Sequence, residues 1–368
     1  MLEVFSWPGQ RGQDTFKQRK MRRLIAFLGR SGIIAASALA GGALYYLYCS
    51  SSTQSGSVKG VAKKKCEEGD GTRETQVVNM PVSAGTRYII STSGRPSSMR
   101  RYKVLLRDIL KVNISYIPIN AGGEESSSKK IDPQDFCFAL RGLRGVGGAI
   151  SKDIKGTVHA FLDNVDDLAK EIGSINTVIC RGDALIGYNT DAYGFKIAIG
   201  QGIEQLAKQG KTVCKAVCYG YGGVCSVVVA CLKSMGIEVY ITGRSLATAS
   251  KRAADLWVDV YDREKHGQCD LFVNAAPVTD EPLKNAVNFL PTLEGCSLVF
   301  DHELVGTELI KYCRANNVIH IPGKAMYWPQ MAEQWKLFLQ DMVDKAVLDN
   351  IMEHLQKAEQ IANGSGLS

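Results

Sequence analysis

Apolar residues from about position 76 onward form two kinds of patterned segment. Short apolar runs of strand length are separated by stretches in which apolar positions recur at helical spacing, which is typical of an α/β protein. In the first half of this region we expect strands at 88–90, 114–117 and 177–180, and helices at 99–110 and 158–172.

A second block, which starts near residue 213, repeats a strand followed by a helix with short connections. Such repeats predict a parallel sheet, because a helical crossover returns the chain to lie beside the previous strand in the same direction. The last part of the chain, 330–360, is expected to form a long amphipathic helical end. The expected strands of this block are 213–218, 238–242, 271–274 and 298–300, and its expected helices are 223–235, 247–257 and 308–315.

These patterns predict an α/β protein of two domains. Residues 76–192, completed by a C-terminal helix within 330–368, are expected to form an α/β substrate-binding domain. Residues 193–329 are expected to form a Rossmann-type dinucleotide-binding domain. A chain of 368 residues, of which 45% are hydrophobic, is long enough for two domains and an N-terminal extension.

A third pattern precedes both domains. Residues 24–49 are almost entirely apolar, with Arg30 as their one charged residue. Because a membrane-spanning helix needs about 20 such residues, we predict a transmembrane helix here, with Tyr45, Tyr46 and Tyr48 at the membrane interface. A cleaved targeting segment and a buried helix of a soluble protein are the alternatives that the sequence leaves open.

The charge of the chain is concentrated near its N-terminus. Of the net charge of +7, residues 1–30 supply +5, so the remainder is close to neutral and gives no reason to expect a nucleic acid as partner. The basic tail, 1–23, favours a cytosolic N-terminus. It predicts a protein that is membrane-anchored or targeted to an organelle, without indicating which membrane. Residues 50–75, rich in Ser, Gly, Thr and Lys, are predicted to be a flexible linker.

Cysteine usage excludes two classes of protein. The chain has 11 cysteines, scattered singly, without a Cys-x-x-Cys pair or a Cys/His cluster of zinc-binding spacing. We therefore expect reduced thiols rather than a disulfide scaffold, and no metal site.

Candidate chemistry begins where the predicted strand 213–218 runs into the glycine-rich segment 219–223 and then into an apolar helix. Glycines let the backbone approach phosphates, and the N-terminus of a helix offers free N–H groups and partial positive charge. Gly220, Gly222 and Gly223 are therefore predicted to bind a dinucleotide, although the spacing departs from the full Gly-x-Gly-x-x-Gly pattern. A tight structural turn is the alternative.

The end of the next predicted strand indicates which dinucleotide is bound. An NAD site usually places an acidic residue there for the ribose 2′-hydroxyl, whereas this chain has Arg244, followed by Lys251 and Arg252. A cation fits a 2′-phosphate, so we predict NADP as the cofactor and NAD as the less favoured one. A solvated arginine in a turn is the alternative interpretation of Arg244.

Four motifs, in order along the chain, resemble those of the shikimate/quinate dehydrogenase family. Gly-Ser-Ile-Asn-Thr-Val at 173–178 is followed by Gly-Tyr-Asn-Thr-Asp at 187–191. Asn-Ala-Ala-Pro at 274–277 is similar to a turn that the family places beside the cofactor, and Gly-x-x-Met-x-x-x-Gln at 323–330 is similar to its closing substrate-binding motif. The resemblance covers residues 86 to about 345 and is closest to the shikimate-dehydrogenase-like subgroup, which carries a Ser-Gly-Arg-Pro-Ser segment like that at 93–97.

The resemblance implies an NADP-dependent dehydrogenase of shikimate, quinate or a related cyclic hydroxy acid, with Lys155 as catalytic lysine and Asp191 as its partner. A lysine beside a carboxylate can hold the hydroxyl of a secondary alcohol, pass its proton and stabilise the developing charge. Two alternatives stay open. Lys152 lies one turn before Lys155, and Asp191 could cap a helix that starts near Ala192.

The resemblance also assigns binding residues. Asn176 and Gln330 would fix ring hydroxyls, whereas Ser93 and Arg95 would face the substrate carboxylate. Ser151 lies in the catalytic loop, which the family writes Asn-Val-Thr-x-Pro-x-Lys, and is assigned to the substrate. Asn274 and Met326 are assigned to the cofactor.

The chain departs from the family pattern at several positions. Ala149 and Asp153 replace the asparagine and proline of the catalytic loop, and Leu304 replaces a tyrosine. These departures support a second hypothesis, a membrane-anchored and catalytically weak or inactive protein that binds a dinucleotide or a metabolite. A general dinucleotide-binding protein, the third hypothesis, would make the family matches coincidental. The expected partner is a small hydroxy acid, and both monomer and homodimer stay open.

Overall fold

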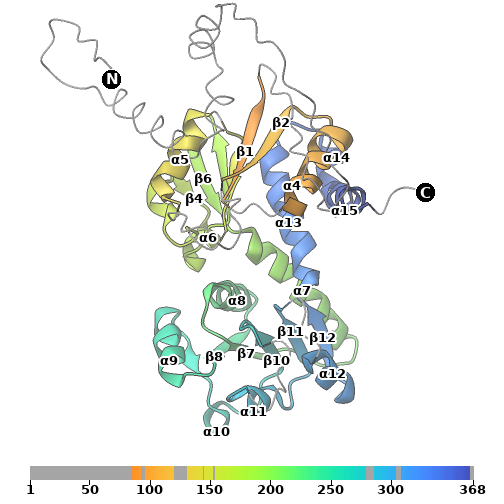
Figure 1. Ribbon diagram of the computed structural model, residues 1–368. Coiled ribbons are helices and arrows are strands. Elements are labelled where there is room, and N and C mark those ends of the chain that lie inside the picture. The colour runs from red at the N-terminus through yellow and green to blue at the C-terminus, as the bar shows by residue number, and fades with distance from the viewer. Residues whose placement is uncertain are drawn as a thin grey trace, which may run out of the picture. The chain divides into compact units, whose positions relative to one another are not determined.

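The part of the chain that is predicted to bind substrate is built on a mixed sheet (Figure 1). Its six strands have the order β2-β1-β3-β5-β6-β4. β1 and β3 are parallel, and so are β4 and β6, whereas β5 runs antiparallel to both β3 and β6. The strands are β1 (Arg87–Ser91), β2 (Ile114–Pro118), β3 (Gly147–Ala149), β4 (Asn164–Val165), β5 (Thr177–Arg181) and β6 (Ala184–Tyr188).

The computed structural model describes residues 85–92, 96–119, 131–143, 145–151, 154–278, 286–303 and 308–364. The predicted tail, apolar run and linker lie outside these ranges, and so do Ser93, Arg95, Lys152, Asp153 and Leu304. Within the described ranges, none of the helices combines the length and the apolar composition that crossing a membrane requires. The anchor at 24–49 therefore stays a prediction.

The second sheet is parallel throughout, and its strand order is β12-β11-β10-β7-β8-β9. Its strands are almost continuous apolar runs, as expected of a parallel sheet that is covered on both faces. This order is that of a doubly wound Rossmann sheet, which confirms the predicted fold class. The strands are β7 (Lys215–Tyr219), β8 (Glu238–Thr242), β9 (Asp259–Val260), β10 (Leu271–Asn274), β11 (Leu298–Asp301) and β12 (Ile319–Pro322).

Helices follow the strands of the second sheet. One buried apolar cluster joins β7, β8 and β10 to α7, α8 and α9, and another joins the same sheet to α11 and α12. The sheet therefore packs against helices on both faces. The helices are α7 (Thr190–Ala207), α8 (Gly223–Ser234), α9 (Leu246–Asp255), α10 (Arg263–His266), α11 (Phe289–Leu293) and α12 (Glu308–Ala315).

The long helix α7 crosses α13 (Lys324–Leu339) closely. At Gly194 an added Cβ atom would lie 2.5 Å from the carbonyl oxygen of Met326 and 2.7 Å from Cβ of Gln330, so this crossing requires glycine. Because Asp191 lies one turn before Gly194, the crossing brings the predicted substrate residue Gln330 close to the N-terminal end of α7.

Two predicted helices are interrupted. The segment 158–172 consists of the 3₁₀ turn η2 (Val158–Phe161), β4 and α6 (Asp167–Ile172). Asp163 stabilises the chain at the first break. Its carboxylate accepts hydrogen bonds from the Leu185 N–H at 2.7 Å and from Arg141 at 2.6 Å. Asp166 caps α6 by accepting from the Leu168 and Ala169 N–H groups.

The predicted C-terminal helix is also divided. It consists of α13, α14 (Lys345–Asp349) and α15 (Ile351–Ala362). The break before α14 falls at Asp344, whose backbone is extended, and Asn350 separates α14 from α15. The remaining described helices are α4 (Pro96–Lys103), the π-helix η1 (Val104–Ile109), which shortens the predicted helix 99–110, and α5 (Pro133–Gly142).

Candidate active site

The structure brings Lys155 and Asp191 together. Lys155 Nζ lies 2.6 Å from Oδ2 of Asp191, and the two side chains are 27% and 15% exposed. Lys155 belongs to a turn whose position is fixed by its own carbonyl oxygen, which accepts a hydrogen bond from the Ile175 N–H at 2.8 Å. The pair is therefore shielded enough for a strong charge-assisted hydrogen bond, while both groups remain within reach of a ligand.

Asp191 does not cap α7. The cap is Asn189, whose side chain accepts from the Ala192 N–H, and α7 begins at Thr190. The carboxylate of Asp191 is instead free to bond to Lys155 through Oδ2 and to Asn176 through Oδ1, at 2.8 Å. The capping alternative is therefore wrong, and the side chain is oriented toward the lysine.

Asn176, which is predicted to fix a ring hydroxyl, makes several hydrogen bonds within the protein. Its side chain is only 3% exposed, and its amide donates to Thr190 Oγ1 as well as to Asp191. Its amide oxygen accepts from the Thr177 hydroxyl and from the Thr190 N–H. Because these bonds use its donors and its acceptor, Asn176 is arranged to orient Asp191 rather than to hold a ring hydroxyl.

Two residues that bond to Asn176, namely Thr177 and Gln334, were not predicted from the sequence. Gln334, which is 8% exposed on α13, donates to Thr177 Oγ1 at 2.7 Å and to the Asn176 carbonyl oxygen at 3.3 Å. Gln334 lies four residues after Gln330, hence on the same side of the helix, and that spacing is the signal that could have identified it. Gln330 itself is half-buried beside Gly194.

The far end of the catalytic loop is tied to the first sheet. The Ser151 N–H donates to Thr92 Oγ1 at 2.7 Å, and the Thr92 hydroxyl donates to Ser151 Oγ at 3.2 Å. The role of Ser151 toward the substrate stays a prediction. Thr92 directly precedes the predicted carboxylate-binding residues, which lie outside the described ranges.

The glycine loop follows β7, at the point where the strand order of the parallel sheet reverses. The loops after β7, β8 and β10 form a cavity of about 230 Å³, and β7 lies between the other two strands. In doubly wound sheets this position, at the carboxyl ends of the strands, is where ligands bind. The cavity is lined by Tyr219, Gly220, Tyr221, Gly222, Gly243, Arg244, Ala275, Ala276 and Pro277.

The predicted cofactor residues divide into two groups. Gly220, Gly222 and Arg244 line the cavity, and Gly223 is the first residue of α8. Asn274 and Met326 are buried, and the fully buried side chain of Asn274 donates to Asp301 at 2.9 Å while accepting from the Ala276 N–H. The role of Asn274 in the structure is thus to shape the loop at 275–277, and direct contact with a cofactor is disfavoured by its burial.

Arg252 does not join Arg244 at the cavity. Its guanidinium donates to the hydroxyl of Ser226, in the second turn of α8. Arg244, by contrast, is exposed at the rim of the cavity. Of the three cations proposed for a 2′-phosphate, Arg244 alone is among the residues that line the cavity, so its position supports the prediction.

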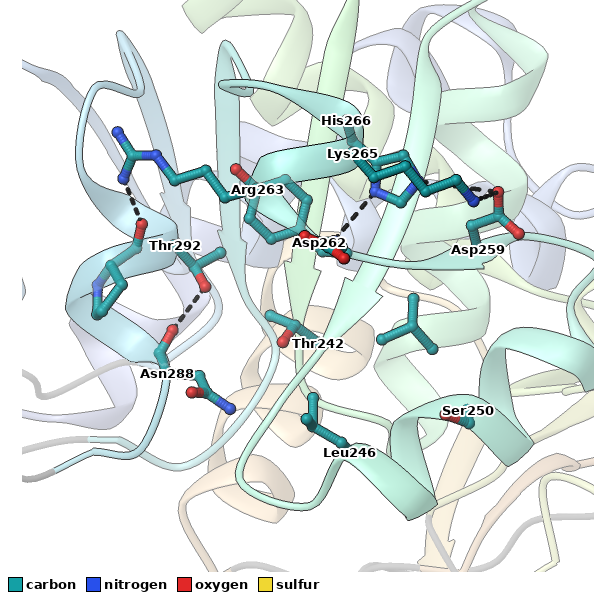
Figure 2. Close-up of a pocket in the computed structure, with 13 residues that line it drawn as sticks. Thr242, Leu246, Ser250, Asp259, Asp262, Arg263, Lys265, His266, Asn288 and Thr292 are labelled. Carbon is teal, nitrogen blue, oxygen red and sulfur yellow. Dashed lines mark hydrogen bonds and ion pairs between the residues drawn. The ribbon is translucent and has the colours of Figure 1, made fainter.

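A larger cavity of about 610 Å³ lies beyond the β8 turn (Figure 2). Its charged side chains pair with one another or bond to backbone groups that line the cavity. Arg263 donates to the Pro291 carbonyl oxygen at 2.7 Å, and Lys265 lies 3.8 Å from Asp259. Because these charges are already paired, the cavity gives no reason to place the candidate site away from the glycine loop. No cluster of metal-ligating side chains is found among the described residues.

Burial perturbs one carboxyl next to the glycine loop. Desolvation raises the pKa of Asp301 to about 6, although hydrogen bonds from Asn274 and from the Glu303 N–H oppose this shift. Asp301 stands at the end of β11 and holds the side chain of Asn274. Its ionisation therefore lowers the stability of the folded state at neutral pH.

We expect Asp301→Asn to stabilise the protein at neutral pH. Since the folded pKa lies above the unfolded value of 3.8, the contribution of Asp301 is favourable at low pH and is lost as the pH rises through about 6. The substitution keeps the acceptor and removes the charge, so the free energy of unfolding should rise by about 1–3 kcal/mol at pH 7.5. Urea unfolding at pH 7.5 and pH 4 tests this, and an equal gain at both values would contradict it.

Known proteins of similar sequence are shikimate dehydrogenases. The chain is 28% identical over 267 residues to a shikimate dehydrogenase-like protein of Haemophilus influenzae, and the match covers 70% of this chain and 92% of that relative. It is 26% identical over 212 residues to the NADP(+) shikimate dehydrogenase of Maridesulfovibrio salexigens, covering 56% of this chain and 75% of the relative. No family profile matches the chain.

The sequence of this chain is similar to those of shikimate dehydrogenases. Solved structures agree on the fold. A shikimate 5-dehydrogenase-like protein superposes with a TM-score of 0.56 at 24% identity, covering 75% of this chain and all 100% of that one. A shikimate dehydrogenase solved with NADP+ superposes with the same TM-score of 0.56 at 21% identity, covering 77% and 97%. The relatives confirm the predicted resemblance in sequence, and the solved structures confirm the two-domain α/β fold.

Proposed function

We propose that this shikimate dehydrogenase relative is an NADP-dependent oxidoreductase that interconverts a secondary alcohol and a ketone on a cyclic hydroxy acid such as shikimate or quinate. The observation that carries the proposal is the Lys155–Asp191 pair, with 2.6 Å between Nζ and Oδ2. The proposal is also supported by similar proteins that are named NADP(+) shikimate dehydrogenases. The predicted oxidoreductase function and its cofactor agree with these relatives.

The pair can perform the proton transfer of such a reaction. Oxidation of a secondary alcohol removes a hydride from carbon and a proton from oxygen. In the direction of ketone reduction, the Lys155 ammonium gives a proton to the substrate oxygen as the hydride arrives on carbon; in the direction of alcohol oxidation, the neutral amine of Lys155 takes that proton. The neighbouring carboxylate of Asp191 holds the lysine in place and stabilises its charged form. Asn176 fixes the carboxylate through Oδ1, so the pair is oriented before substrate arrives.

The residues of the glycine loop fit the phosphates of a dinucleotide. At Gly222 and Gly223, no atom of a residue distant in the chain lies within 4 Å of an added Cβ, so a ligand can approach the backbone at the N-terminus of α8. Arg244 at the cavity rim would hold a 2′-phosphate. NADP, when bound, supplies the acceptor for the hydride.

A turnover assay tests this proposal. The purified full chain should reduce NADP in the presence of shikimate or quinate. The absorbance of the reduced nicotinamide at 340 nm measures this reaction. Both substrates are needed, because Ala149 and Leu304 differ from the family pattern where it contacts the ring acid. Tight binding of NADP without turnover of either acid would contradict the proposal.

Arg244→Gln should change the choice of cofactor. We expect the Kd for NADP to rise by about 10–100-fold and the Kd for NAD to change little, because only NADP carries the 2′-phosphate that the guanidinium would pair with. Calorimetric titration of both nucleotides measures this. Arg263→Gln, in the cavity of Figure 2, is the matched control and should leave both affinities unchanged. An equal loss for NAD and NADP would contradict the role of Arg244.

A weak or inactive dinucleotide-binding protein is the second candidate. The observation in its favour is Ala149, which ends β3 beside Ser151 and offers no side-chain polar group where the family motif has asparagine. Cofactor affinity in the micromolar range, combined with no turnover on a panel of cyclic hydroxy acids, would support this candidate over the first.

A further inference from the structure

A continuous series of side-chain hydrogen bonds leads from α13 to the catalytic pair. Gln334 donates to Thr177 at 2.7 Å, Thr177 donates to Asn176 at 2.8 Å, and Asn176 donates to Asp191 at 2.8 Å. Asp191 in turn accepts from Lys155 at 2.6 Å. The series joins three parts of the chain that are distant in sequence.

Each donor in this series fixes the direction of the next bond. The amide N–H of Gln334 occupies the oxygen of Thr177 as an acceptor, so the Thr177 proton is directed to Oδ1 of Asn176. That oxygen also accepts from the Thr190 N–H at 2.9 Å. A flipped Asn176 amide would place its NH₂ against two donors, and its oxygen would then face the carboxylate of Asp191.

Burial makes the orientation costly to lose. Gln334, Thr177 and Asn176 are 8%, 0% and 3% exposed, so water cannot replace a missing partner. Gln334 makes its hydrogen bonds to Thr177 and to the Asn176 backbone, and not to Lys155 or Asp191. Its influence on the catalytic pair is therefore indirect.

We propose that Gln334 is a positioning residue for the reaction: through Thr177 it holds the amide of Asn176 in the orientation that keeps Asp191 directed at Lys155. The inference rests on the proposed function and deepens it, because it makes α13 part of the catalytic machinery. Substrate contact by Gln330 and orientation of the pair by Gln334 would then come from one helix.

A double-mutant cycle tests the route through Thr177. Gln334→Leu and Thr177→Val should each lower kcat about tenfold, with the KM for NADP unchanged, since each removes one hydrogen bond of the series. The double variant should lose no more than either single variant. Thr177→Ser, which keeps the hydroxyl, should retain most of the kcat that Thr177→Val loses, although valine matches threonine better in volume.

Thr292→Val is the matched control. Thr292 is also buried, and its hydroxyl donates to the Asn288 carbonyl oxygen at 2.6 Å, remote from the series in the sequence and in its contacts. It should leave kcat unchanged. Independent, additive losses in the double variant, or a Thr177→Ser variant as impaired as Thr177→Val, would overturn the proposal, since both are the behaviour of residues that act by packing alone.

A second measurement separates this inference from the proposed function. Acylation of Lys155 by an amine reagent, followed by mass spectrometry, reports how firmly Asp191 holds the ammonium and needs no substrate. Gln334→Leu should raise the labelling rate of Lys155 several-fold relative to Thr292→Val. If the wild-type chain turns over neither acid, the proposed function fails while this result still decides the positioning role, and an unchanged labelling rate overturns it.

Discussion

Replacement of Lys155 by methionine is expected to lower kcat by about a thousandfold. Methionine retains most of the length of the side chain but has no ammonium to donate to the substrate oxygen or to stabilise its charge. Because the pair lies in a partly buried position, water is a poor substitute for the lost group. Steady-state rates of NADP reduction with the preferred acid, with the Kd for NADP measured separately, provide the test.

The control for this substitution is Lys170→Met. Lys170 lies on α6 and pairs with Asp167 at 2.8 Å, at an exposed position that the proposed reaction does not use. It should leave kcat and the affinity for NADP unchanged. If Lys155→Met retains wild-type turnover, the assignment of the catalytic lysine is wrong, whatever the substrate proves to be.

The sequence predicted best those parts of the site that are local. The glycine loop joins the strand Lys215–Tyr219 directly to the helix Gly223–Ser234, and its glycines are visible as residue types. The Lys155–Asp191 pair came from motif order rather than from local pattern. The two residues lie on different elements, and their contact depends on how the turn at 154–157 packs against the start of β5.

The parts that were not predicted depend on contacts between distant segments. Asn176 was assigned to the substrate because its motif indicates a polar site residue, but pattern cannot show that Thr177, Thr190 and Asp191 use all of its hydrogen-bonding groups. Gln334 was not predicted, because its hydrogen-bond partner Thr177 lies on the first sheet, far from it in the sequence. Similarly, the break at 162–166 follows from Asp163 bonding to β6, which no helical periodicity reveals.

Gly220→Ala is expected to destabilise the protein by about 2–4 kcal/mol and to abolish NADP binding. Gly220 has φ of 125°, a conformation that side-chain-bearing residues rarely adopt. An added Cβ would also lie 2.9 Å from both the carbonyl carbon and oxygen of Ala275, which are backbone atoms that cannot move without distorting the loop after β10. Both walls of the cavity would therefore shift. Thermal unfolding and nucleotide titration measure the two effects.

Gly222→Ala separates stability from binding within the same loop. Gly222 has φ of −77°, and apart from its chain neighbours no residue has an atom within 4 Å of an added Cβ. The free energy of unfolding of the variant should therefore be within about 1 kcal/mol of the wild-type value. The methyl group would nonetheless occupy open space where Gly222 lines the cavity, and we expect NADP affinity to fall about tenfold. If Gly222→Ala binds NADP as tightly as the wild-type chain, the phosphates do not approach the backbone here. The contrast between the two variants thus distinguishes a glycine needed for the turn from a glycine needed for the ligand.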